Sequence, residues 1–210
     1  MHVDTEPQPI ETERLMLRRS RPEDAATISA YRSDPNVNRQ QGWDRTDLEG
    51  VLADIVEMSG RSPGEPGGWV QFTVEERGGG RIVGDVGLSV ADGEPGVIKV
   101  GYTIDPAFQG LGYATEAIRA LVEYAFETLG AELVRAHASA ENAPCVLVWE
   151  SPHTIVMPGW VSPSCGPMTW TIPWWGEPMP WSGIPNSAQF VSSCLTCAAA
   201  MESSIGRLRS

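Results

Sequence analysis

The stretch "DPAFQGLGYATEA", residues 105–117, decides the fold that this sequence predicts. Gly110 and Gly112 stand one residue apart, between a strand candidate that ends at Pro106 and a segment with the periodicity of a helix. A helix that begins directly after a glycine-rich turn directs successive backbone N–H groups, and the positive end of its dipole, at one point. Glycine also lets the backbone come close to a ligand. The stretch therefore predicts a turn that holds a phosphate.

Three other interpretations of this turn can be weighed on the residues around it. A dinucleotide fingerprint needs a third glycine where Thr115 stands, and an early strand–helix–strand unit, so it is disfavoured. A P-loop ends in Gly-Lys-Ser or Gly-Lys-Thr, and the chain has a single lysine, Lys99, which excludes it. A tight turn that binds nothing remains open, because two spaced glycines are a weak signal by themselves.

The pattern of apolar residues on both sides of the turn predicts a mixed α/β fold. Alternation with a period of two predicts strands at residues 15–18, 69–76, 81–90, 97–105 and 131–140. Apolar spacings of three and four predict helices within residues 21–34, 44–60 and 112–130. Strands and helices in this order predict one mixed sheet flanked by helices.

The charge of the chain limits its partners. The 210 residues carry 27 acidic and 15 basic side chains, which gives a formal net charge of −12. Nucleic acids and anionic membranes repel such a chain, so neither is expected as the main partner. A cationic substrate such as an amine would be attracted, although acidic charge also serves solubility alone. The polar, acidic N-terminus is unlike a signal peptide and no apolar run reaches 18 residues, so we expect a cytoplasmic protein without a membrane span.

Residues 151–210 differ in composition from the rest of the chain. All four cysteines and six of the eight tryptophans lie after residue 144, and only four charged side chains follow residue 150. We therefore divide the chain into a folded core at residues 11–150 and an atypical C-terminal segment at residues 151–210. The segment is either a genuine alternative C-terminus with an aromatic surface or the product of a shifted reading frame, and we expect loosely packed polypeptide. Its Cys194-Leu-Thr-Cys197 pair has the spacing of a zinc or redox motif but lacks a second pair.

Three longer stretches carry a resemblance to a known family. They are "GYTIDPAFQGLGYATEAIRALVEYAFETLG" at 101–130, "VRAHASAENAP" at 134–144 and "ETERLMLRRSRPEDAATISAYRSDPNVNRQQGW" at 11–43. Together they resemble the GNAT family of N-acetyltransferases, in particular the branch that acetylates the N-termini of ribosomal proteins. The resemblance covers residues 11–150 and implies a splayed mixed sheet that binds acetyl-CoA, whereas residues 151–210 do not match the family's last strands.

The motif Gln109-Gly110-Leu111-Gly112-Tyr113-Ala114 fits the family's Q/R-x-x-G-x-G/A signature. By the resemblance, the pyrophosphate of acetyl-CoA would lie on the amides of Gly110 to Thr115. The pantetheine arm would run beside residues 97–105 as an extra strand, and an amide among Tyr102, Thr103 and Ile104 would polarise the thioester carbonyl. Asn142 matches an asparagine that contacts the arm, and it is equally suited to cap a helix at "ENAP".

The resemblance leaves the catalytic groups incomplete. Relatives of this branch place a serine three residues beyond the asparagine, and many other members use a later tyrosine. Here Cys145 stands at the first position and no tyrosine follows Tyr124. A thiol, with an unperturbed pKa of about 8.5, is suited to protonate the leaving thiolate, but Cys145 can equally be a small, half-buried packing residue. Tyr31 and Trp43 are candidate walls of an acceptor pocket or simply core residues, and no general base or metal site is assigned.

The sequence therefore predicts direct transfer of an acetyl group from acetyl-CoA to a primary amine in a ternary complex. The resemblance suggests a protein N-terminus, a polyamine or an aminoglycoside as the acceptor, and a homodimer is kept as a candidate assembly. The alternative is a CoA-binding or partner-binding module with impaired catalysis, because the acceptor-side strands and the general acid are altered.

Overall fold

The computed structural model describes residues 8–41, 43, 45–138, 142, 145, 148–149, 160–161 and 168–173, the last two ranges by their backbone. The chain divides into two compact units, Met1–Trp174 and Trp175–Ser210, and every described residue belongs to the first. The hypotheses about the Cys194–Cys197 pair and about an aromatic surface after residue 173 lie outside the described residues.

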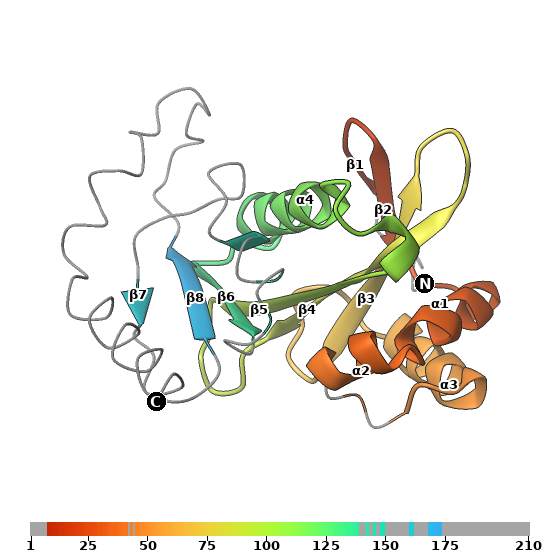
Figure 1. Ribbon diagram of the computed structural model, residues 1–210. Coiled ribbons are helices and arrows are strands. Elements are labelled where there is room, and N and C mark those ends of the chain that lie inside the picture. The colour runs from red at the N-terminus through yellow and green to blue at the C-terminus, as the bar shows by residue number, and fades with distance from the viewer. Residues whose placement is uncertain are drawn as a thin grey trace, which may run out of the picture. The chain divides into compact units, whose positions relative to one another are not determined.

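Within the described residues, eight strands form one sheet in the order β1-β2-β3-β4-β5-β6-β8-β7 (Figure 1). The strands are β1 Ile10–Glu11, β2 Leu15–Arg19, β3 Trp69–Glu76, β4 Ile82–Val90, β5 Val97–Ile104, β6 Leu133–Ala138, β7 Trp160–Val161 and β8 Met168–Pro173. Every neighbouring pair is antiparallel except β5 and β6, which run parallel. The predicted mixed sheet is confirmed, and β2 to β6 lie where the alternation of apolar residues placed them.

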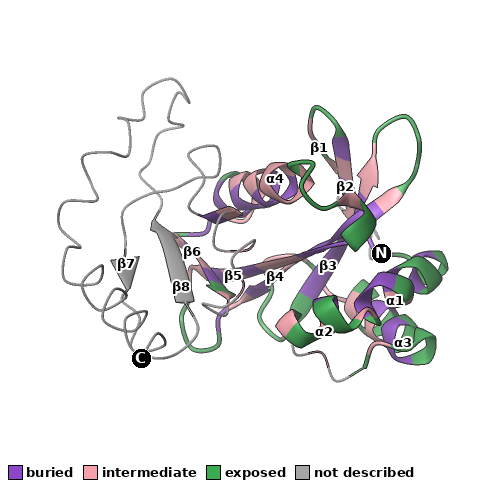
Figure 2. Ribbon diagram, viewed as in Figure 1, coloured by how far each residue is buried: buried purple, intermediate pink, exposed green. Residues whose placement is uncertain are grey.

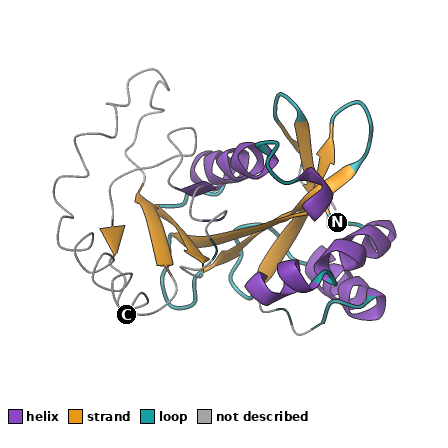
Figure 3. Ribbon diagram, viewed as in Figure 1, coloured by secondary structure: helices purple, strands orange, loops and turns teal. Residues whose placement is uncertain are grey.

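The helices are η1 Pro22–Asp24, α1 Ala25–Arg32, α2 Pro35–Gln41, α3 Leu48–Ser59, η2 Pro106–Phe108 and α4 Tyr113–Glu127 (Figure 3). The three predicted helical segments are confirmed as η1 with α1, as α3 and as α4. The sequence pattern does not predict α2, because Val37 is the buried residue of that helix and no apolar stripe marks it. No helix of the described ranges combines the length and the apolar character that a membrane crossing requires.

Helices cover both faces of the sheet. Consecutive residues of a strand point to opposite faces, so neighbouring residues of β3 identify what lies on each. On β3, the ring of Phe72 meets the ring of Tyr124 on α4 edge-on, with the centroids 6.1 Å apart. Its neighbour Thr73 points the other way and donates a hydrogen bond to Asp24, the residue before α1. Thus α4 covers one face, while η1 and α1 lie on the other (Figure 1).

The larger core lies between the sheet and α4, where the buried residues of both meet (Figure 2). Its largest fully buried side chains include Leu15, Leu17, Phe72, Leu88, Ile118 and Leu121. A smaller core joins α1 to α3, and there Val51 and Ile55 are buried. Three other apolar residues of α3, Leu48, Leu52 and Val56, are exposed. The buried apolar face of α3 is therefore narrower than the apolar pattern of its sequence suggests.

Two strands of the C-terminal segment extend the sheet beyond β6. Strand β8 pairs antiparallel with β6, from Leu133 opposite Pro173 to Ala138 opposite Met168, and β7 pairs with β8. The sequence does not predict these strands, because prolines interrupt the segment and no long alternation is present. Residues outside the family resemblance thus supply one of the two neighbours of β6, while β5 is the other.

Candidate functional site

The parallel strands β5 and β6 separate partway along their length. Their pairing ends at Val100 and Ala136, yet β5 continues to Ile104 and β6 to Ala138. Among the residues that the structure describes, the edge of β5 that faces β6 therefore has no paired strand over its last residues, while its other edge stays paired with β4. An open strand edge is a template for an extended ligand, which can pair with it as an added strand.

Two glutamine side chains reveal which backbone groups face this open edge. Gln41, at the end of α2, donates from Nε2 to the carbonyl of Tyr102 at 2.8 Å, and Gln109 donates from Nε2 to the carbonyl of Ile104 at 3.0 Å. In an antiparallel pair, alternate residues turn both their N–H and their C=O toward the partner strand or both away from it. Tyr102 and Ile104 therefore turn their N–H groups to the open edge, whereas Thr103 turns its own to β4. Two of the three predicted amides remain candidates for the thioester carbonyl.

The predicted phosphate turn has the geometry that its sequence implies. Gly110 and Gly112 adopt φ angles of 76° and 80°, a region that residues with a side chain rarely enter. Helix α4 begins directly after Gly112, and Glu116 donates its amide to the carbonyl of Gly112 at 3.1 Å. The amides of residues 113–115 precede that bond and have no acceptor inside the helix. Such amides, at the positive end of a helix dipole, are donors of the kind that anions bind, so the predicted phosphate site stays a candidate.

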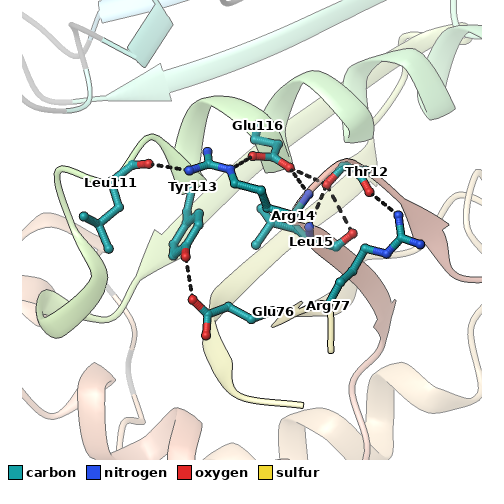
Figure 4. Close-up of polar contacts among 8 residues, drawn as sticks. All are labelled: Thr12, Arg14, Leu15, Glu76, Arg77, Leu111, Tyr113 and Glu116. Carbon is teal, nitrogen blue, oxygen red and sulfur yellow. Dashed lines mark hydrogen bonds and ion pairs between the residues drawn. The ribbon is translucent and has the colours of Figure 1, made fainter. Parts of the chain in front are cut away.

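Side chains from distant parts of the chain contact this turn and the start of α4 (Figure 4). Leu111 is exposed, and the hydroxyl of Tyr113 donates to Glu76 on β3. Arg14 approaches from the segment before β2: its Nη1 donates to the carbonyl of Leu111 at 3.0 Å, and its guanidinium lies over the Tyr113 ring, 4.8 Å from the centroid. The turn is thus braced from outside by residues far away in the sequence.

Asn142 and Cys145 lie beyond β6, and the structure joins them to each other and to β5. The Oδ1 of Asn142 accepts from the amide of Cys145 at 3.3 Å, which is the cap that "ENAP" predicts. The thiol of Cys145 is hydrogen-bonded with Tyr102 and with Trp149. Burial raises the pKa of Cys145, and these two hydrogen bonds offset only part of that shift. The candidate acid therefore stays protonated at neutral pH and contacts a residue of the open edge.

The other two predicted site residues, Tyr31 and Trp43, are linked by the ion pair of Arg32 with Asp85. The hydroxyl of Tyr31 donates to Oδ1 of Asp85 at 2.5 Å, and Nη2 of Arg32 donates to Oδ2 of the same carboxylate at 3.0 Å. The Arg32 guanidinium also lies over the ring of Trp43, 4.2 Å from the centroid. Burial and the charge of Asp85 raise the pKa of Tyr31, so its hydroxyl stays protonated. Tyr31 is only 3% exposed and acts here as a core residue, while the half-buried Trp43 remains a candidate wall.

Sequence reasoning missed four residues that hold these groups in place: Arg14, Arg32, Gln41 and Asp85. Each of them acts across a long stretch of chain, such as Gln41 on Tyr102 and Arg32 on Asp85. A single polar residue in a strand or helix has no periodic signal. The one available hint is Asp85, a carboxylate within the apolar run "RIVGDVGLSV", because a charge placed there requires a buried partner.

Comparisons with known proteins agree on the family. A family model described as "Acetyltransferase (GNAT) domain" matches residues 14–151. A Bacillus licheniformis protein, described as the uncharacterized N-acetyltransferase p20, is 29% identical over 140 residues, which are 67% of this chain and 78% of that protein. The GNAT-family acetyltransferase from Bacillus anthracis superposes with a TM-score of 0.66 at 22% identity, over 79% of this chain and 98% of that one. A Vibrio cholerae structure, provisionally described as a ribosomal-protein-serine acetyltransferase, gives 0.65 at 20% identity, over 80% and 99%.

Proposed function

The chain belongs to the GNAT acetyltransferase family and is an acyltransferase, and we propose that it moves an acetyl group from acetyl-CoA to a primary amine by direct transfer. Residues 11–150 are proposed as the acetyl-CoA-binding core. One observation carries the proposal: the open edge of β5 leads, within a few residues, into a glycine turn at the N-terminus of α4, where the first amides of the helix have no acceptor inside it. A ligand with an extended amide-bearing arm and a pyrophosphate at its end would match both parts.

The chain's residues divide the binding of this ligand between them. The amides of residues 113–115 would hold the pyrophosphate, in a turn that Gly110 and Gly112 shape. The N–H groups of Tyr102 and Ile104 would pair with the arm, and the side-chain amide of Asn142 would contact it. When bound, acetyl-CoA would supply an acetyl group activated as a thioester.

The proposed transfer needs one donor for negative charge and one for a proton. The N–H of Tyr102 or Ile104 would stabilise charge that develops on the acetyl oxygen. Cys145 would give its proton to the thiolate that leaves as the new C–N bond forms and the C–S bond breaks. Water would take the proton released by the amine and return one to Cys145, so that the protons balance. The raised pKa of Cys145 supports this role, because an acid must be protonated before it acts.

We propose a cationic acceptor, either the N-terminus of a basic protein or a polyamine. The net charge of −12 would attract such a substrate. The fold neighbour provisionally described as a ribosomal-protein-serine acetyltransferase supports the protein acceptor by analogy of fold. Trp43 is proposed to line the path of the acceptor.

Release of free thiol from acetyl-CoA tests the proposal directly. The full chain would be assayed with spermidine, with a peptide carrying a basic N-terminal sequence and with an aminoglycoside, while calorimetry measures CoA binding. Binding together with thiol release for at least one amine is the expected result. CoA binding without turnover for any acceptor would instead favour the alternative, a CoA-binding module with impaired catalysis. A chain that binds no CoA would overturn both.

A further inference from the structure

We propose that Arg14 is a positioning residue for the phosphate turn: it aims the amide of Gly112 at the ligand and balances the charge of Glu116. This inference rests on the proposed function, because it assigns the turn to the pyrophosphate of CoA. Arg14 lies outside the motif, about a hundred residues earlier in the chain, in the segment between β1 and β2. Figure 4 shows its guanidinium between the turn and the first residues of α4.

The contact of Arg14 with Leu111 sets the direction of the next amide. Nη1 of Arg14 donates to the carbonyl oxygen of Leu111 at 3.0 Å. In a planar trans peptide, the C=O of one residue and the N–H of the next point in opposite directions. Holding the carbonyl of Leu111 on Arg14 therefore turns the N–H of Gly112 to the opposite side. A hydrogen bond to that carbonyl also polarises the peptide and makes its N–H a better donor.

The contact with Glu116 removes a competitor for the same site. A carboxylate in the first turn of a helix is stabilised by the dipole that would also attract a phosphate. Glu116 lies there, and it accepts from Nε of Arg14 and from the hydroxyl of Thr12, each at 2.6 Å. Burial alone would raise the pKa of Glu116, but the hydrogen bonds from Thr12 and Arg14 outweigh it and lower the pKa below its usual range. Glu116 is thus charged, and Arg14 is the cation that balances it.

The backbone of Arg14 is fixed before any ligand arrives. Its N–H donates to Oε1 of Glu116 at 2.8 Å, and its C=O accepts from the N–H of Arg77 at 2.9 Å. The stacking of its guanidinium on the Tyr113 ring restricts the side chain as well. A group held in this way loses little further freedom when the ligand binds. The arrangement therefore fits a preorganised support of the turn.

Arg77 offers a matched control on the same part of the surface. Its side chain is 47% exposed, against 46% for Arg14, and it also donates to a backbone carbonyl, that of Thr12 at 2.6 Å. It touches neither Leu111 nor Glu116 among the contacts of the described residues. Replacing Arg77 removes an arginine of similar exposure and leaves the support of the turn in place.

The test measures binding of CoA, and of pantetheine as a probe without phosphates, to the full chain by calorimetry. We expect Arg14→Gln to weaken CoA binding about tenfold, because the turn loses one charge-assisted hydrogen bond. Pantetheine binding should change by less than about twofold, because pantetheine has no phosphate. Arg77→Gln should leave both affinities unchanged. Adding Glu116→Gln to Arg14→Gln should restore about threefold of the lost CoA affinity, because it removes the unbalanced carboxylate. Circular dichroism of each variant establishes that the fold persists.

The outcomes separate this inference from the proposed function. If the wild-type chain fails to bind CoA, the proposed function falls and the role of Arg14 falls with it. If the wild type binds CoA and Arg14→Gln binds it equally well, the inference alone is overturned. A loss that is equal for CoA and pantetheine, or that Glu116→Gln does not relieve, would also overturn it, since a general loosening of the fold would act in that way.

Discussion

The two halves of the proposed site use different chemical groups: backbone amides on one side and side chains on the other. The cofactor side, residues 100–116, consists of one strand edge and one turn, and its functional groups are backbone amides. The acceptor side, comprising Tyr31, Arg32, Gln41, Trp43 and Asp85, consists of side chains from α1, α2, the loop after α2, and β4. Apart from Asn142, the first half is continuous in sequence, whereas the second is assembled only by folding.

This difference separates binding from stability. A ligand that rests on backbone amides is lost when the shape of the turn changes. A buried ion pair such as that of Arg32 with Asp85 affects the folded state first, because removing one partner leaves the other charge buried without balance. Substitutions on the acceptor side should therefore change mainly the stability of the fold, and substitutions in the turn should change mainly the affinity for CoA.

The largest effect is expected at Asp85, on the acceptor side. Asp85→Asn removes the carboxylate charge that balances Arg32, whose side chain is 4% exposed. We expect a loss of about 3 kcal/mol in the free energy of unfolding, as for other buried pairs that lose one partner. Urea denaturation of the variant and the wild type measures it.

A surface pair provides the control for Asp85. Glu57 pairs with Arg61 on α3 and the following loop, where the Glu57 side chain is 64% exposed, so Glu57→Gln should cost less than about 1 kcal/mol. Equal losses from the two substitutions would contradict the idea that burial makes the acceptor side a stability element.

Cys145 is expected to show the largest effect on catalysis. If its thiol protonates the leaving group, Cys145→Ala should lower kcat about a hundredfold, the smaller end of the range for a general acid. Cys145→Ser should keep most of the activity, because a hydroxyl can occupy the same hydrogen bonds. Steady-state rates at saturating acetyl-CoA measure both variants.

The pH dependence of kcat tests whether Cys145 acts as an acid. An acid acts in its protonated form, and burial raises the pKa of Cys145 above the usual range of a thiol. The wild-type rate should therefore hold through neutral pH and fall only as the pH rises through that raised pKa. In Cys145→Ser this alkaline limb should disappear, and a limb that persists unchanged would assign it to another group.

Gly112 tests the cofactor side through the shape of its turn. Gly112→Ala places a side chain at a φ of 80°, which costs about 1–2 kcal/mol for a residue with a Cβ. We expect the turn to relax away from this angle and CoA affinity to fall about tenfold. Calorimetric titration with CoA measures the change.

Gly130 separates strain from function, because it also has a positive φ, of 68°, and lies after the other end of α4. A Cβ at this position meets nothing within 4 Å. Gly130→Ala should therefore cost similar stability and leave CoA affinity unchanged. If both alanines weakened CoA alike, the geometry of the turn would have no special part in binding.

The same contrast explains what the sequence could predict. The turn at Gly110 and Gly112, the strands β3 to β6 and helix α4 follow from local periodicity and from glycine chemistry, so their positions were predictable. The partners of Asp85 and of the Tyr102 carbonyl come from residues more than 50 positions away, and no local pattern records such a contact. Strand β8 escaped prediction for a different reason, since its proline-rich surroundings hide the alternation that marks a strand.

Gln41 is the point where the two sides touch, and it should give the smallest of these effects. Its side-chain amide donates a hydrogen bond to the carbonyl of Tyr102. The N–H groups of Tyr102 and Ile104 then remain as the donors of the open edge. Without this hydrogen bond, the partial negative charge of the Tyr102 carbonyl oxygen would lie unbalanced near the developing oxyanion. We expect Gln41→Ala to lower kcat about fivefold, roughly the worth of one neutral hydrogen bond, with the KM for acetyl-CoA nearly unchanged.

Gln40→Ala, the neighbouring residue of the same type on α2, is the matched control and should leave kcat unaltered. A change in the KM for acetyl-CoA without a change in kcat would place Gln41 on the cofactor side alone. A change in kcat that depends on which amine is used would place it with the acceptor. Only a lower kcat with every amine, at constant KM for acetyl-CoA, fits a residue that links the two sides through the Tyr102 carbonyl.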